Sequence, residues 1–403
     1  MPRADFARFW AAQAISGVGS QITVLALPIL ALNTLGVTPW ELGLLNALQF
    51  APLVLFTLVA GMLVDRHAPR PVLIWGNALA GVVLLALPAL WTADLLSFWM
   101  VCVAGFLLGA FRVGIDVSVH SYPPYILSQD ALVTANARLG VTYAATEVAG
   151  PGLAGLVLQL VRPAVALAAD AVSYLVAAVL VSRTVVVRQH RRPARFRFAD
   201  VLGGFAPAFR DPYLRAMVLL SSWFNLWGSA ISTALMVYAV REARLDVRVI
   251  GLCLTVGGLG GLLGSAAAPR VGRIIGVGMT LRVSILVTLG GWFLIPWGGG
   301  AVLLCAGLAV QTFGDGLYNV FAMSLRQTVA EPERLGRINA CYRLLSHGGI
   351  PLGALVAGLL MDVLSARQVL LVAACAATAG SVPLLLSRVF AVRDIESLAA
   401  ARG

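Results

Sequence analysis

The stretch IDVSVHSYPPYILSQDALVTANAR (115–138) aligns, at an offset of 203 residues, with YNVFAMSLRQTVAEPERLGRINAC (318–341). Five positions are identical at this offset: Val117/Val320, Ser121/Ser324, Leu132/Leu335, Asn136/Asn339 and Ala137/Ala340. In separate loops the same offset pairs Gly61 with Gly264 and Arg70 with Arg273. Because agreement at one offset in separate loops is not easily accidental, the sequence predicts two homologous halves.

Both halves are strongly apolar. Hydrophobic residues make up 60% of the 403 residues, charged residues make up 12%, and the mean hydropathy is +0.90. A soluble domain has about 45–50% apolar and about 25% charged residues, so this composition excludes a soluble globular or a disordered chain. Twelve membrane helices of about 20 residues use roughly 240 positions, which is close to the apolar total.

Apolar windows bounded by Arg, Pro, Asp and Gly predict six membrane spans in each half. The first six lie near 9–35, 43–64, 71–91, 97–119, 137–159 and 164–182. The second six lie near 215–239, 249–268, 277–297, 301–324, 338–361 and 368–387. We therefore predict an all-α membrane protein with 12 transmembrane helices in two pseudo-symmetric six-helix bundles.

The distribution of arginine predicts the orientation of the spans. All 29 basic residues are arginine. With the N-terminus inside, 22 of them fall in inside segments and five in outside segments, which places both termini in the cytoplasm. We expect bundles over 1–184 and 215–403, joined by a basic cytoplasmic linker, 185–214. Attraction to anionic lipid explains the charge of the linker, so no nucleic-acid partner is expected.

The cysteines and the absent motifs argue against other kinds of chemistry. The five cysteines are scattered through apolar runs, without a CxxC pattern: Cys102, Cys253, Cys305, Cys341 and Cys375. We expect small core residues rather than disulfides or metal ligands. No ATP-binding motif or nucleophile–base constellation stands out, so we expect neither an enzyme nor a cofactor or metal.

The segment GMLVDRHAPRPVLI (61–74) resembles the loop signature G-x-x-x-D-R-x-x-x-R of the major facilitator superfamily, beginning at Gly61. The resemblance implies that Asp65, Arg66 and Arg70 form a charge relay that holds an inner gate. The second-half counterpart, GSAAAPRVGR (264–273), lacks the Asp and the first Arg of the signature. A gate on one side only is therefore expected.

The fifth predicted span carries TEVAGPGLAG (146–155), which is similar to the G-P-x-x-G-G element of drug:proton antiporters. Gly150, Pro151 and Gly155 match that element, which shapes a kinked and closely packed helix. With FWAAQAISGVGSQ (9–21) and GLLNALQFAPLVLF (43–56), the whole chain resembles the macrolide-efflux and enterobactin-exporter branch of the superfamily. The resemblance implies two parallel repeats with the substrate site between them near the bilayer midplane.

Ionisable side chains inside a span are costly, about 2.5–3.5 kcal/mol each at the centre on insertion scales, and are functional candidates by default. Arg112 and Asp116 lie four residues apart on the fourth span, where they can pair. At the 203 offset they correspond to Asp315 and Asn319 in the tenth span. The family resemblance implies that these spans line a cavity, across which Arg112 and Asp315 could approach each other.

Further polar candidates lie in the first, fifth, seventh and eleventh spans. Glu147 lies four residues before Pro151, and a local offset of 200 matches it to His347. A carboxylate in apolar surroundings suits reversible proton uptake, so we predict Asp315 and Glu147 as proton-coupling residues. The alternative is that each group only satisfies a neighbouring helix. Gln21 and Asn225 are expected to line a cavity for an amphipathic ligand.

Asp170, near the outer end of the sixth span, is expected to be structural.

These patterns predict a secondary transporter that exports a small amphipathic compound, such as a drug, a macrolide or a siderophore, by proton antiport with alternating access. We expect a monomer in the bacterial inner membrane, with protons as the coupling ion and the lipid bilayer and the substrate as partners. One alternative is a proton-coupled uptake symporter of the same fold. Another is a transport-inactive membrane sensor or scaffold.

Overall fold

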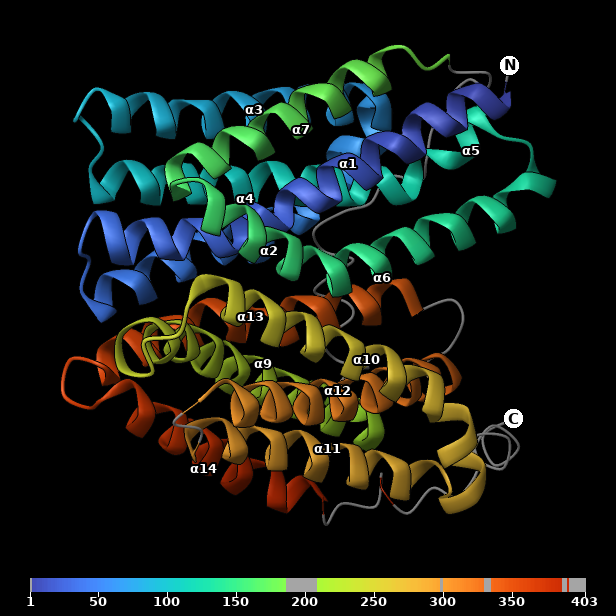
Figure 1. The fold of residues 1–403 in the computed structure, drawn as a ribbon. Helices are drawn as coiled ribbons and strands as arrows, with labels where there is room; N and C mark the ends of the chain where they lie inside the picture. The colour runs from blue at the N-terminus through green and yellow to red at the C-terminus, as the bar shows by residue number, and fades with distance from the viewer. Residues whose placement is uncertain (1, 186–208, 298–299, 330–334, 386–389, 391–403) are drawn as a thin grey trace. The chain divides into compact units, whose positions relative to one another are not determined.

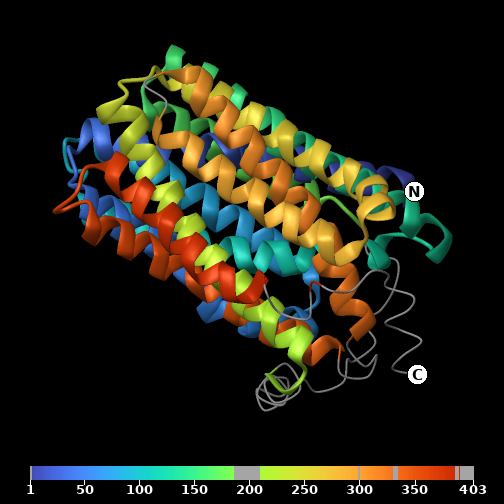
Figure 2. The same cartoon turned by 90° about the horizontal axis from the view of Figure 1, so that it is seen from below.

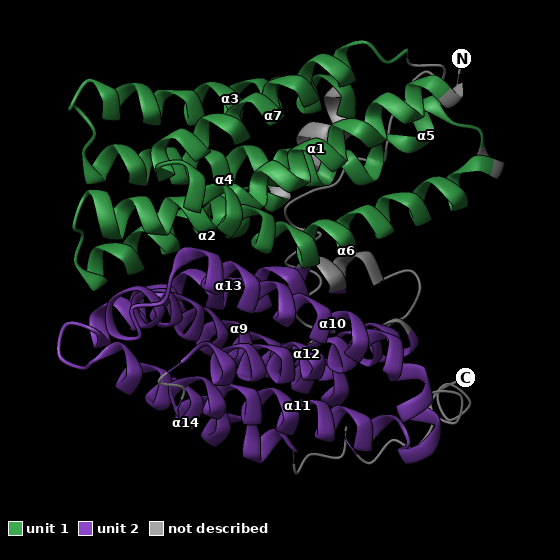
Figure 3. Cartoon of the chain, viewed as in Figure 1, with its two compact units in different colours: residues 1–196 green, residues 197–403 purple. Residues whose placement is uncertain are grey.

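The computed structural model describes residues 2–185, 209–297, 300–329, 335–385 and 390, and these residues form helices and turns without a strand. The chain divides into two compact units, Met1–Phe196 and Arg197–Gly403 (Figure 3). The division falls inside the predicted linker, 185–214, of which residues 186–208 lie outside the described part of the chain.

Unit 1 holds six long helices and one short helix in its described residues (Figure 1). They are α1 (Pro2–Ile29), α2 (Pro39–His67), α3 (Pro69–Thr92), α4 (Phe98–Ser121), the short α5 (Pro123–Ile126), α6 (Gln129–Leu160) and α7 (Pro163–Ser182). A π-helical turn, η1 (Leu30–Thr34), extends α1.

Unit 2 also holds six long helices in the part that the structure describes. They are α9 (Pro212–Val237), α10 (Val247–Ile275), α11 (Val277–Leu294), α12 (Ala301–Val329), α13 (Leu335–Leu360) and α14 (Ala366–Leu385). A π-helical turn, η2 (Tyr238–Glu242), follows α9, just as η1 follows α1, and a 3-10 turn, η3 (Ile295–Trp297), follows α11.

The same five pairs of helices pack together in each unit. In unit 1, α1 packs against α6 and α7, α2 against α4, and α3 against α4 and α7. In unit 2, α9 packs against α13 and α14, α10 against α12, and α11 against α12 and α14. Figure 2 shows α11 and α12, in yellow and orange, running alongside each other. The predicted pseudo-symmetric pair of six-helix bundles is therefore confirmed.

Eleven of the described helices are long and apolar enough to cross a membrane. The remaining long helix, α9, is 26 residues long and carries several polar side chains, among them Ser221, Ser222 and Asn225. The chain is thus a multi-pass membrane protein. The predicted cytoplasmic location of both termini stays a prediction.

Local sequence signals explain where several helices begin. Thr38 and Glu41 form a capping box at the start of α2, where Pro39 takes the first helical position. Asp211 accepts hydrogen bonds from the Tyr213 and Leu214 backbone N–H groups at the start of α9, at 2.8 and 3.0 Å. These side chains satisfy N–H groups that have no partner within the helix.

Small residues let α10 and α12 pack closely along their length. A methyl group added to Gly260 would overlap the Ala309 carbonyl oxygen, and one added to Gly264 would overlap that of Phe313. The Thr312 hydroxyl donates a hydrogen bond to the Gly257 carbonyl oxygen across the same seam. Close approach of backbones through small residues is typical of membrane helix pairs, where lipid offers no hydrophobic driving force.

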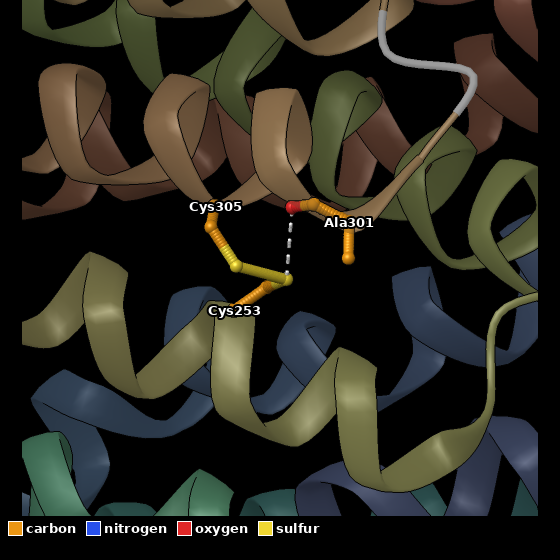
Figure 4. Close-up of a disulfide and its surroundings, with 3 residues drawn as sticks. All are labelled: Cys253, Ala301 and Cys305. Atoms are coloured by element: carbon orange, nitrogen blue, oxygen red, sulfur yellow. Dashed lines mark hydrogen bonds between the residues drawn. A yellow bond between two sulfur atoms is a disulfide. The ribbon is translucent and has the colours of Figure 1, made fainter.

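This seam brings two cysteines together near the start of both helices. Cys253 on α10 and Cys305 on α12 form a disulfide, with Cα atoms 4.4 Å apart (Figure 4). Cys253 Sγ also lies 3.5 Å from the Ala301 carbonyl oxygen. The expectation that all five cysteines are unpaired core residues is therefore wrong for this pair. Helix spacing, which sequence separation does not reveal, decides which thiols meet.

Candidate functional site

The predicted pair on the fourth span is present in unit 1. Arg112 Nε and Asp116 Oδ2 on α4 lie 3.9 Å apart, and both side chains are exposed. Arg112 also interacts electrostatically with Asp170 on α7, and Asp116 interacts with Tyr143 on α6. Charged and titratable groups from three helices thus act on one another within this unit.

Asp170 is the buried member of this group. It lies on α7 with no exposed surface. One carboxylate oxygen accepts a hydrogen bond from Thr23 Oγ1 on α1, and the other accepts one at 2.8 Å from Ser173 Oγ. Asp170 is the eighth residue of the 20-residue α7. This carboxylate connects α1 to α7.

The glycine–proline element on the fifth span forms the contact between α6 and α1. Pro151 lies inside α6, and a methyl group added to the buried Gly150 would overlap the Gln21 side chain on α1. Gly155 is also buried. One helical turn before Pro151, Glu147 is exposed. The element therefore serves close packing, and Gln21 takes part in it.

Asp315 in unit 2 is only partly exposed on α12 and is bonded to its own unit. Its Oδ1 accepts a hydrogen bond of 3.0 Å from Thr288 Oγ1 on α11, and the Gln311 side chain is a further partner. Asn319, four residues later, is exposed. Arg112 belongs to unit 1 and Asp315 to unit 2, so their predicted approach stays a prediction.

The other unit 2 candidates occupy α9 and α13. His347 Nδ1 lies 3.0 Å from the Arg343 carbonyl oxygen and 3.1 Å from Ser346 Oγ, so its partners belong to its own helix. Asn225 is partly buried on α9. Pro351 lies inside α13, as Pro151 lies inside α6. None of the described hydrogen bonds joins these candidates into one cluster.

The loop signature that begins at Gly61 ends at Arg70, which is hydrogen-bonded. Arg70, at the start of α3, donates a 2.6 Å hydrogen bond to the Ser182 carbonyl oxygen at the end of α7. Gly61, Asp65 and Arg66 lie in α2, but their side chains fall outside the described residues. The predicted charge relay therefore stays a prediction.

Two more side chains hold the same end of α7. Arg8 on α1 donates a 3.1 Å hydrogen bond to the Arg183 carbonyl oxygen, and the Tyr122 and Thr184 hydroxyls bond to each other. Burial raises the pKa of Tyr122, while the hydrogen bond to Thr184 acts in the opposite direction. Cationic side chains at a helix C-terminus satisfy its last carbonyls and favour its dipole.

The hydroxyl partners of Asp170 and Asp315 were not identified from the sequence. Thr23 and Thr288 look like ordinary polar residues in apolar runs, and only the packing of α1 on α7 and of α11 on α12 brings them to Asp170 and Asp315. In the described part of the chain, no group of three His, Cys, Asp or Glu side chains is placed to hold a metal ion.

A family model described as Major Facilitator Superfamily matches residues 9–276 and 218–400. One relative is the uncharacterized MFS-type transporter y4rN of Sinorhizobium fredii (strain NBRC 101917 / NGR234), 25% identical over 370 residues and 89% of each chain. Another is macrolide efflux protein A of Streptococcus pyogenes, 22% identical over 379 residues and 89% of each chain.

Two solved transporter structures share the fold. The nucleoside transporter NupG matches with a TM-score of 0.78 at 13% identity, covering 94% of this chain and 98% of that one. A bacterial homologue of the iron transporter ferroportin, in an inward-facing state, matches with a TM-score of 0.72 at 18% identity, covering 95% and 99%. At these identities the likeness establishes the fold alone.

Proposed function

Because the chain belongs to the Major Facilitator Superfamily and is a membrane transporter of that fold, we propose that it exports a small amphipathic compound in exchange for protons. It acts as a monomer in the bacterial inner membrane, with both termini in the cytoplasm. It needs no cofactor and is not an enzyme. The observation that carries the proposal is the set of ionisable side chains within membrane-spanning helices, above all Asp315.

The direction of transport rests on two likenesses. One relative is named macrolide efflux protein A. Gly150, Pro151 and Gly155 match three positions of the antiporter element, and Gly150 packs against α1. Both likenesses favour export of an amphipathic cargo over uptake.

The coupling rests on charge within the spans. A proton that reaches Asp315 or Glu147 from outside neutralises a carboxylate and so favours one conformation of the transporter. Cargo that binds from the cytoplasm or the inner leaflet favours release of that proton. Arg112 and Asp116 supply a pair of opposite charges in unit 1. The cargo can shift this equilibrium only by its differential affinity for the two conformations.

The test is transport by the full chain reconstituted alone in liposomes under an imposed pH gradient, with a fluorescent amphipathic dye as cargo. We expect dye to move against the direction of the protons. We expect this flux to be at least tenfold lower in the double variant with Asp315→Asn and Glu147→Gln than in the wild-type chain. Asp362→Asn, which neutralises an exposed carboxylate beyond the end of α13, is the matched control and keeps the flux.

Three results would overturn the proposal. An unchanged flux in the double variant would remove these carboxylates from the coupling. Dye that moves in the same direction as the protons would indicate an uptake symporter. An absence of flux from folded protein, over several amphipathic dyes, would favour a sensor or scaffold.

A further inference from the structure

Asp170 in unit 1 is a buried and hydrogen-bonded carboxyl group. The proposed proton coupling by Asp315 and Glu147 does not use it. Its side chain is fully buried between α1 and α7, both of which have the length and composition of membrane spans. Thr23 Oγ1 from α1 and Ser173 Oγ from α7 each bond to one of its two oxygens. The hydrogen-bond partners of the carboxyl group are thus hydroxyl groups rather than cations.

The backbone of α1 closes this site. A methyl group added to Gly19 would overlap both Asp170 Oδ1 and Ser173 Oγ, so the missing side chain at Gly19 makes the space that the carboxyl group fills. One residue further along α1, Ser20 bonds to the Tyr174 hydroxyl at 2.9 Å. The α1–α7 interface therefore excludes water from Asp170 while the two helices stay packed.

The charges around Asp170 do not neutralise it directly. Arg112 on α4 acts on it electrostatically but forms its described ion pair with Asp116. Tyr174 on α7 is its titratable neighbour. The described contacts of Asp170 with α1 involve uncharged groups, and none is described with α3. An ionised carboxylate buried without a bonded cation is strongly disfavoured.

Protonation of Asp170 removes the cost of a buried negative charge, and the groups already present can bond to the neutral acid. A protonated carboxyl group has one O–H donor and keeps acceptor capacity, and a threonine hydroxyl can both donate and accept. Thr23 Oγ1 is therefore able to accept the acid proton of Asp170, while Ser173 still donates to the other oxygen. The site accommodates the neutral acid without any change of backbone.

We propose that Asp170 is a second proton-binding site of the transporter, which holds its proton while α1 and α7 are packed and exchanges it when they separate there. An O–H bond forms with a proton taken from water on the outer side and breaks as that proton passes to cytoplasmic water, and no electrons are transferred. The role in coupling rests on the proposed function, whereas occupancy of the site by a proton does not.

Occupancy is tested by infrared spectroscopy of the full chain in liposomes at neutral pH. We expect the carbonyl stretching band of a protonated carboxylic acid, with one component lost in D170N. Thr23→Val shifts that component because it removes the hydrogen-bond partner, and it serves as the second variant if D170N does not fold. Thr378→Val, which removes a hydroxyl that bonds within its own helix in unit 2, leaves the band unchanged. Wild-type and D170N spectra without a difference in this band would overturn the proposal.

The role in coupling is tested by proton uptake during dye export in the same liposomes. We expect the coupled proton flux to be at least tenfold lower in D170N than in the wild-type chain, and to be unchanged in Thr378→Val. Proton-driven export that is unchanged in D170N would overturn the role of Asp170 and leave Asp315 as the carrier. If the wild-type chain transports nothing, the proposed function fails, and the infrared result still decides whether Asp170 holds a proton.

Discussion

Hydroxyl groups donate hydrogen bonds to two carboxylates within the spans, the buried Asp170 and the partly exposed Asp315. Asp170 accepts from Thr23 and Ser173, and Asp315 accepts from Thr288. A hydroxyl satisfies a carboxyl oxygen without adding a charge, so the carboxyl group can gain or lose a proton without breaking an ion pair. This residue-scale arrangement is what a proton carrier needs.

The bond between Thr288 and Asp315 leads to a prediction about stability. Thr288→Val leaves the partly buried carboxylate of Asp315 without its hydroxyl donor. We therefore expect the free energy of unfolding to fall by about 1–3 kcal/mol. Thr378→Val on α14 is the matched control, because its hydroxyl bonds to the Ala374 carbonyl oxygen of its own helix. Thermal unfolding of both variants in detergent measures the difference. Equal shifts for the two variants would contradict the structural role of Thr288.

The sequence predicts contacts within one helix better than contacts between helices. Arg112 and Asp116 pair as predicted, because residues four apart share a helix face. The bond between Asp170 and Thr23 joins residues 147 positions apart. A single sequence shows polarity and spacing but not which turns of two helices face each other, so this contact could not be predicted.

At the scale of the elements, the predicted spans match the helices but are often shorter. The span predicted at 249–268 corresponds to α10, Val247–Ile275, and the span predicted at 301–324 corresponds to α12, Ala301–Val329. Hydropathy detects the part of a helix that suits lipid, whereas backbone hydrogen bonding continues into polar segments such as Pro269–Arg273. The charged helix ends were therefore missed.

The disulfide between α10 and α12 predicts a countable difference in free thiols. Denatured without reductant, the chain should take up three maleimide labels, on Cys102, Cys341 and Cys375, and after reduction it should take up five. Cys305→Ser frees Cys253, so this variant should take up four labels under both conditions. Labelling must precede any oxidation by air, and mass spectrometry of the intact chain gives the count. Five labels without reductant would contradict the disulfide.

At the scale of the whole molecule, the internal repeat is the strongest link between sequence and fold. A common offset of 203 residues, read from a few identities, corresponds to two units in which the same five helix pairs pack. The π-helical turns η1 and η2 follow the first helix of each unit. The units differ in their chemistry, since one buries Asp170 between α1 and α7 and the other bonds Asp315 between α11 and α12.

The activity proposed for this chain is export of an amphipathic compound driven by the proton gradient. The most direct measurement is the accumulation of a fluorescent amphipathic dye in efflux-deficient bacteria that express the full chain, with and without a protonophore. We expect lower accumulation than in cells that express the double variant with Asp315→Asn and Glu147→Gln at equal membrane levels. We also expect the protonophore to abolish this difference. Accumulation that is equal in the two strains, or higher with the wild-type chain, would contradict the proposed activity.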